Sequence, residues 1–108
     1  MAEGRIRIGI GGWKYDDWRG AFYPDGLPQK RELAYAAARL TAIEVNGTFY
    51  GTLSAKSFAS WRDETPEDFV FALKAPRYAT NRRVLAEAGD SIARFRSSGI
   101  SELGPKLG

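Results

Sequence analysis

The stretch that decides the fold is Thr41-Ala42-Ile43-Glu44-Val45-Asn46-Gly47-Thr48-Phe49-Tyr50. Ile43 and Val45 are β-branched residues at alternate positions, a pattern that predicts a strand with one apolar face. Glu44 and Asn46 then lie on the opposite face of that strand. Because a buried carboxylate is costly without a partner, we expect this second face to open on a polar site.

Two other segments carry the same alternation of apolar and polar positions. In the first, three isoleucines share one face, and in the second two phenylalanines and a leucine do. Elsewhere, apolar residues recur every three or four positions, which predicts helices. The expected strands are residues 5–11, 41–46 and 68–74, and the expected helices are residues 29–40, 55–64 and 87–101.

The order strand, loop, helix occurs three times in the chain. This order predicts a parallel sheet with right-handed crossovers. Strands of a doubly wound sheet are apolar on both faces, whereas these strands have one apolar face, which favours a closed barrel. A closed (β/α)8 barrel needs more than ~200 residues, and this chain has 108. We therefore predict an α/β fold that comprises the first three βα units of a truncated TIM barrel.

The composition excludes several classes of protein. Hydrophobic residues make up 44% of the chain and charged residues 27%, which is typical of one small globular domain. There is no cysteine and no histidine, which removes disulfides, thiolate metal sites and the commonest general base. No apolar run reaches the ~18 residues of a spanning helix, and the chain starts without an apolar leader. We expect a cytoplasmic protein with no membrane contact and no metal site.

Four motifs, in order, resemble those of the DUF72 (YecE-like) family. They are Gly9-Ile10-Gly11-Gly12-Trp13-Lys14-Tyr15, Asp17-Trp18-Arg19-Gly20 with Phe22-Tyr23-Pro24, Glu44-Val45-Asn46-Gly47-Thr48-Phe49-Tyr50, and Phe71-Ala72-Leu73-Lys74-Ala75-Pro76-Arg77. The resemblance covers essentially the whole chain, so residues 1–108 are expected to be a partial DUF72-like domain. It implies a TIM barrel of about twice this length or more, and it implies no particular activity. The family usually has a hydroxyl residue where this chain has Gly11 and Gly47.

Glu44 and Lys74 are the candidate catalytic residues. In a barrel, both side chains would project inward near the carboxyl ends of neighbouring strands. Opposite charges within about 4–6 Å keep each other ionised, and a lysine can act as a base or stabilise an oxyanion. The alternative is a structural ion pair that fills the barrel interior.

The candidate substrate-binding residues follow the same strands. They are Trp13, Tyr15, Asn46, Thr48, Tyr50 and Arg77. Aromatic faces at a barrel mouth can stack on sugar rings or nucleobases, or they can form the local core of a long loop. An arginine there can recognise phosphate or carboxylate, and an asparagine can orient a substrate hydroxyl or satisfy loop backbone groups.

Two functions fit these residues. The first is a barrel enzyme acting on a small polar or phosphorylated substrate at the carboxyl ends of the strands. The alternative is a nucleic-acid or nucleotide-binding module that uses the aromatic and basic mouth loops; the net charge is +3. A third interpretation is a fragment without a function of its own. These residues identify no cofactor, reaction type or oligomeric state.

Overall fold

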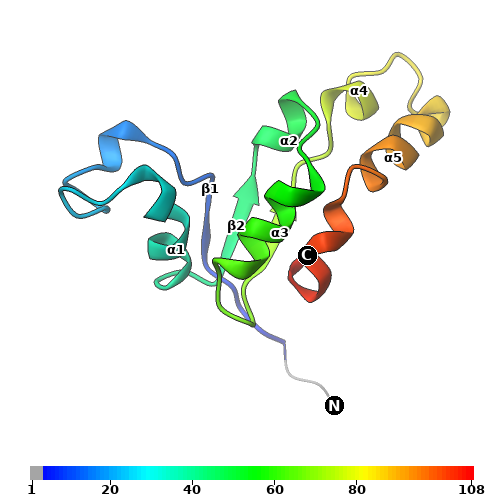
Figure 1. The fold of residues 1–108 in the computed structure, drawn as a ribbon. Helices are drawn as coiled ribbons and strands as arrows, with labels where there is room; N and C mark the ends of the chain where they lie inside the picture. The colour runs from blue at the N-terminus through cyan, green and yellow to red at the C-terminus, as the bar shows by residue number, and fades with distance from the viewer. Residues whose placement is uncertain (1–3) are drawn as a thin grey trace.

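The protein is an α/β fold built on a parallel sheet, and the computed structural model describes residues 4–108. The strand order is β1-β2-β3, so strands that follow one another in the chain also pair in the sheet (Figure 1). The strands are β1 (Gly9–Gly11), β2 (Ala42–Val45) and β3 (Val70–Leu73). The α/β class and the parallel pairing expected from the sequence are confirmed.

Short helices connect and follow the strands. The α-helices are α1 (Glu32–Ala37), α2 (Gly47–Tyr50), α3 (Ala55–Asp63), α4 (Arg77–Thr80) and α5 (Gly89–Arg96). The 3₁₀ helices are η1 (Asp16–Trp18), η2 (Gln29–Arg31), η3 (Leu85–Glu87) and η4 (Ile100–Lys106). The helix expected over residues 29–40 is thus divided into η2 and α1. The helix expected over residues 87–101 ends at Arg96, and η4 begins after Gly99, whose φ of 110° breaks the helix.

The first strand is shorter than the expected residues 5–11, because side chains replace part of its backbone pairing. The Thr41 hydroxyl accepts a hydrogen bond from the Ile8 N–H at 2.7 Å. The Arg7 guanidinium donates to the carbonyl oxygens of Thr41 at 3.3 Å and Asp68 at 2.6 Å. Regular pairing with β2 therefore begins only at Gly9.

The apolar face expected in this first segment is only partly packed. Ile10 packs against the core and is half-buried, but Ile6 and Ile8 are 88% and 68% exposed. The prediction of one packed isoleucine face is therefore wrong for Ile6 and Ile8. Both residues precede Gly9, the first residue of the strand, so they have no place in the sheet to bring them against the core.

The two faces of the sheet differ. One face is the core side, where Ile43, Val45 and Phe71 are buried against Phe58 of α3 and Leu103 of η4. The other face carries small residues and the exposed Glu44 side chain, as the alternation in β2 predicts. The strands therefore have one packed face and one open face.

The close spacing of β1 and β2 depends on Gly9. A Cβ atom at this position would collide with the carbonyl oxygen of Ala42 and lie 2.7 Å from its carbonyl carbon. Gly9 is paired with Ala42 in the parallel register. Only glycine allows this approach of one backbone to the other.

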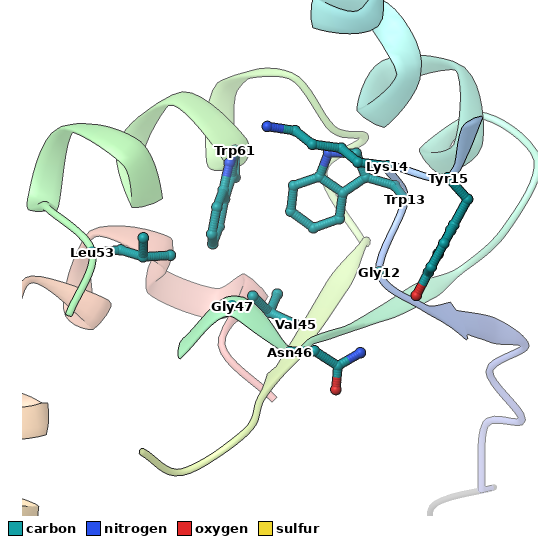
Figure 2. A pocket seen from close by; sticks show the side chains of 9 residues that line it. All are labelled: Gly12, Trp13, Lys14, Tyr15, Val45, Asn46, Gly47, Leu53 and Trp61. Atoms are coloured by element: carbon teal, nitrogen blue, oxygen red, sulfur yellow. The ribbon is translucent and has the colours of Figure 1, made fainter. Parts of the chain in front are cut away.

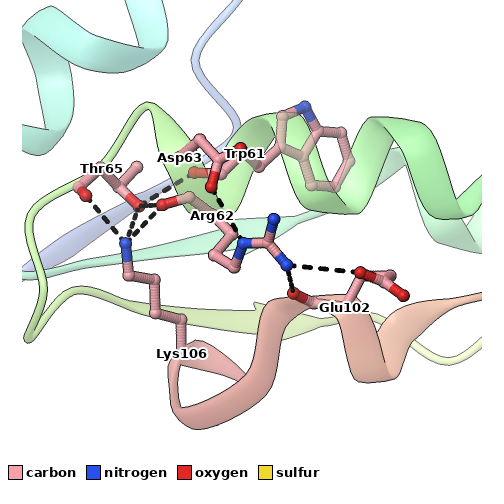
Figure 3. Close-up of polar contacts among 6 residues, drawn as sticks. All are labelled: Trp61, Arg62, Asp63, Thr65, Glu102 and Lys106. Carbon is pink, nitrogen blue, oxygen red and sulfur yellow. Dashed lines mark hydrogen bonds and ion pairs between the residues drawn. The ribbon is translucent and has the colours of Figure 1, made fainter.

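A buried lysine joins the last helix to α3 (Figure 3). Lys106 is 8% exposed, and its ammonium donates to the carbonyl oxygens of Arg62 and of Thr65, the latter at 2.8 Å, and to the Thr65 hydroxyl at 3.0 Å. Arg62 adds a bond from its guanidinium to the Glu102 carbonyl oxygen at 3.1 Å. Cations near a helix C-terminus satisfy carbonyl groups that lack a partner within the helix, so Lys106 stabilises the end of α3.

The final residues lie beside β3. Leu107 forms a parallel bridge with Phe71, and the Gly108 N–H donates to the Phe71 carbonyl oxygen at 2.8 Å. The polypeptide therefore returns, after η4, in the same direction as β3 and next to it.

Candidate functional site

A pocket of about 310 Å³ lies at the carboxyl ends of β1 and β2 (Figure 2). It is formed by the segment after β1, the segment after β2, and the face of α3 that turns toward them. Its lining residues are Gly12, Trp13, Lys14, Tyr15, Val45, Asn46, Gly47, Leu53 and Trp61. Carboxyl ends of parallel strands are the usual place for a ligand site in α/β proteins.

Two indoles form the apolar wall of this aromatic pocket. Trp13 and Trp61 meet edge to face, with ring centroids 5.1 Å apart and an interplanar angle of 86°. Trp61 is held in turn by Phe58, one helical turn earlier, at 5.3 Å between centroids. Trp13 is buried against the core, yet it still lines the pocket. The sequence left open whether the loop aromatics form a local core or line a pocket. Trp13 does both.

The loop that carries Trp13 is fixed by a buried tyrosine. The Tyr23 hydroxyl donates to the Trp13 carbonyl oxygen at 2.5 Å, and Tyr23 is fully buried. Burial, followed by the nearby Glu32 carboxylate and the Tyr15 phenol, raises the pKa of Tyr23 to about 12. The hydroxyl therefore stays protonated and able to donate at neutral pH.

Glu32, the carboxylate near Tyr23, is 1% exposed. Its Oε2 atom is 3.4 Å from the Arg19 Nε, while its Oε1 atom has no hydrogen-bond partner within residues 4–108. Arg19 also lies 3.6 Å from the Asp16 carboxylate. This cluster holds the loop between β1 and α1 to the first turn of α1.

The polar side of the aromatic pocket is formed by Asn46, which follows β2 and is half-buried. A Cβ atom built on Gly11 would lie 3.4 Å from the Asn46 Nδ2 and 3.8 Å from the Glu44 Oε1. The Asn46 amide and the Glu44 carboxylate therefore share the space in front of Gly11. Asn46 thus connects the aromatic pocket to the open face that carries Glu44.

Tyr15 and Lys14 form the rim of the aromatic pocket. The Tyr15 hydroxyl donates to the Gly11 carbonyl oxygen, and its ring packs on Trp18 with centroids 4.4 Å apart. Lys14 is exposed, and Figure 2 shows its side chain along the upper edge of the pocket in this view. The rim therefore adds one cation and one phenol to a pocket formed by the two indoles and the Asn46 amide.

Glu44 and Lys74 do not form an ion pair. Within residues 4–108, no ion pair shorter than 4.0 Å joins them, and the Lys74 ammonium lies 4.7 Å from the centroid of the Phe49 ring instead. Both side chains are exposed. A lysine over an aromatic face is held by the electrostatic field of the ring. The expected contact between these two charges is therefore corrected: they lie at the ends of neighbouring strands without touching.

The remaining predicted binding residues occupy different positions. Thr48 is buried, and its hydroxyl donates to the Lys74 carbonyl oxygen at 2.7 Å, so it joins the segments after β2 and β3. Tyr50 is 69% exposed at the end of α2 and packs on Phe49. Arg77 is exposed at the start of α4. None of these three lines the aromatic pocket.

A model of the family described as "Protein of unknown function DUF72" matches residues 7–108. The chain belongs to the DUF72 family.

Curated DUF72 relatives carry the name UPF0759. The UPF0759 protein YunF of Bacillus subtilis (strain 168) is 31% identical over 70 residues, which is 65% of this chain and 24% of YunF. The UPF0759 protein YecE of Escherichia coli (strain K12) is 26% identical over 103 residues, which is 95% of this chain and 35% of YecE. The chain therefore spans between a quarter and about a third of the length of these relatives.

Solved DUF72 structures share the fold. A DUF72 family protein from Thermotoga maritima MSB8 aligns with a TM-score of 0.69 and 28% identity, covering 94% of this chain and 41% of that protein. A DUF72 family protein from Enterococcus faecalis V583 aligns with a TM-score of 0.67 and 23% identity, covering 95% of this chain and 37% of that protein.

The site residues expected from the sequence of this DUF72 chain do not include Trp61, Leu53 and Lys14, whose side chains also line the pocket. Trp61 and Leu53 lie far from Trp13 in the chain, whereas Lys14 directly follows it. Trp61 recurs at helical spacing after Phe58, a pattern that predicts a core residue, so no local signal assigned it to a pocket.

No group of three metal-ligating side chains lies close enough together to hold a metal ion, as far as residues 4–108 are concerned. Over the same residues, no helix combines the length and the apolar character needed to cross a membrane.

Proposed function

We propose that the chain supplies the first three βα units of a TIM-barrel enzyme whose aromatic pocket binds a small polar or phosphorylated substrate. Sites in such barrels lie at the carboxyl ends of the strands, where the aromatic pocket lies. The parallel order of the strands and their single packed face support the barrel. So does the path of Leu107 beside Phe71, which is where the next strand of a barrel would start.

One side of the pocket is apolar and the other side carries polar and charged groups, which suits an anion that contains a ring. Trp13 and Trp61 meet at nearly a right angle and offer an apolar corner, against which a sugar or a base can pack. The Asn46 amide can donate and accept hydrogen bonds, and the Lys14 ammonium attracts a phosphate or carboxylate at the rim. In this arrangement Glu44 serves as acid or base beside Asn46, and Lys74 adds positive charge from the next strand.

One observation carries the proposal. Asn46 lines the aromatic pocket and also faces, together with Glu44, the space in front of Gly11. Glu44 lies outside the aromatic pocket, so we expect a substrate held against the indoles to extend past Asn46 to reach the carboxylate. An acid or base acts within hydrogen-bond reach of a bound molecule, and Glu44 would satisfy this requirement for the polar end of such a substrate.

Titration calorimetry tests the binding half of the proposal. The probes are adenosine 5′-monophosphate and glucose 6-phosphate, with inorganic phosphate as the ring-free comparison. We expect the ring-bearing probes to bind more tightly than phosphate. Asn46→Ala should weaken that binding about tenfold, the loss of one hydrogen bond to a charged or polar group. Asn81→Ala removes an exposed amide outside the pocket and serves as the control.

Two results would contradict the proposal. One is phosphate binding as tightly as the ring-bearing probes, which would leave the indoles without a role. The other is equal affinity in Asn46→Ala and Asn81→Ala. The enzymatic half is tested in a full-length DUF72 protein by Glu44→Gln at the matching position, which should lower turnover of a bound substrate while leaving its affinity within about threefold.

A further inference from the structure

A second surface, independent of the aromatic pocket, is formed by residues 77–96, here called the basic lobe. The lobe comprises α4, η3 and α5, and Figure 1 shows these elements together at one end of the molecule, away from α1. Its arginines form two groups in the sequence. They are Arg77, Arg82 and Arg83 in the first group, and Arg94 and Arg96 in the second.

The fold brings these two groups together. The Arg82 guanidinium donates to the Ser91 hydroxyl at 2.6 Å, which links the segment after α4 to α5. The Arg94 guanidinium lies over the Tyr78 ring, 4.6 Å from its centroid. Both contacts are to neutral groups, so neither removes the positive charge of its arginine.

The basic lobe holds the whole excess charge of the protein. It contains five arginines against Glu87 and Asp90, an excess of three positive charges, which equals the net charge of +3 for the chain. The rest of the chain is therefore neutral overall. A positive field confined to one end of a protein attracts polyanions to that end.

The fold itself makes little use of these charges. Elsewhere, Arg5, Arg19 and Arg62 are paired with carboxylates. Within the described residues 4–108, none of the ion pairs includes an arginine of the basic lobe. Arg83 and Arg96 are exposed and, over the same residues, make no side-chain hydrogen bond. Their charges are available to a partner.

We propose that the basic lobe binds the phosphate backbone of a single-stranded nucleic acid. The cations of the lobe are all arginines, whose planar guanidinium binds phosphate through two parallel hydrogen bonds. The Tyr78 ring beside Arg94 supplies an aromatic surface of the kind on which unpaired bases stack. A lipid surface fits less well, because α5 has only eight residues and half-buries Phe95 against the protein.

Fluorescence anisotropy with a labelled polyuridine oligonucleotide tests this proposal. The test variant is the double substitution Arg83→Gln and Arg96→Gln, since neither side chain makes a hydrogen bond, an ion pair or a cation–π contact within residues 4–108. The control is Lys30→Gln with Arg31→Gln, which removes the same charge from η2, at the other end of the molecule. Circular dichroism of both variants checks that each is folded.

We expect the protein to bind the oligonucleotide with an affinity that falls steeply with salt. The test variant should bind about tenfold more weakly at low salt, and its slope of log affinity against log salt should be shallower by about 1.4, for two lost phosphate contacts. The control should keep the affinity within about twofold and leave the slope unchanged.

Three results would overturn the proposal. Unchanged binding by the test variant would mean that the lobe is not the surface used. Equal losses in the test variant and the control would mean that only overall charge matters. Binding to vesicles of phosphatidylserine and phosphatidylcholine, lost in the test variant and without oligonucleotide binding, would assign the lobe to a membrane surface. Asn46→Ala should leave oligonucleotide binding unchanged, which separates this proposal from that of the aromatic pocket.

Discussion

The hydroxyl of Tyr23 and the carbonyl oxygen of Trp13 are joined by a buried hydrogen bond of 2.5 Å. Tyr23 lies on the loop that follows β1, and Trp13 forms one wall of the aromatic pocket. Trp13 is thus held in place by a hydrogen bond within its own loop as well as by its attachment to β1. Stability and pocket shape are therefore coupled at this pair.

Tyr23→Phe should lower the free energy of unfolding by about 1–3 kcal/mol, because it leaves a buried carbonyl oxygen without its donor. Urea unfolding followed by tryptophan fluorescence measures the change. Tyr35→Phe is the matched control, since Tyr35 packs on Tyr23 and its hydroxyl has no hydrogen bond within residues 4–108. Similar losses in the two variants would show that ring packing, and not the hydroxyl, holds the loop.

Alkaline pH should destabilise the protein through Tyr23. The pKa of Tyr23 is raised to about 12 from the ordinary 10.0, so the folded state favours the protonated form more than the unfolded state does. The stability from this protonation is complete below pH 10 and is lost as the pH rises toward 12, by an amount on the order of 2 kcal/mol. Unfolding measured from pH 8 to pH 12 should show this loss, and Tyr23→Phe should show a smaller one. Parallel curves for the two proteins would refute the assignment.

Lys106→Met should destabilise the protein by about 1–3 kcal/mol, because it keeps the apolar stem but removes the donor to the Arg62 and Thr65 carbonyl oxygens. Lys56→Met, an exposed substitution in α3, should change stability by less than about 0.5 kcal/mol. Acetylation followed by mass spectrometry offers a second measurement, in which Lys106 should react far more slowly than Lys56. Equal reaction rates would mean that the ammonium is accessible.

Adding a methyl group should have very different effects on stability at two glycines of β1. Gly9→Ala places a Cβ against the Ala42 carbonyl group, which forces the strands apart and should cost about 1–3 kcal/mol or more. Gly11→Ala has room, since its nearest neighbour is the Asn46 Nδ2 at 3.4 Å, and should change stability by less than about 1 kcal/mol. Thermal unfolding of the two variants compares them directly. A Gly11→Ala variant as unstable as Gly9→Ala would contradict the open space in front of Gly11.

The sequence predicted the buried and open faces best for β2, the central strand, which has a paired strand on each side. In β2, alternation alone placed Ile43 and Val45 in the core and Glu44 on the open face, as observed. The same alternation misplaced Ile6 and Ile8, because a periodic pattern predicts which residues share a face but not whether another element covers that face.

The site was less predictable, for two physical reasons. Trp61 reaches Trp13 only through the packing of α3, a contact between residues far apart in the chain that no local pattern records. The Lys74 side chain has several rotatable bonds, and strand position fixes its starting point but not its partner, which is the Phe49 ring in place of Glu44. The strand ends were therefore predictable, whereas the contacts made by long side chains there were not.

The confinement of the excess charge to the basic lobe has a consequence for handling the protein. On a sulfonate cation exchanger, the molecule should be retained through that one end, and it should elute at a higher ionic strength than a protein with the same charge of +3 spread evenly. Its orientation on the resin would leave the α1 end facing the mobile phase.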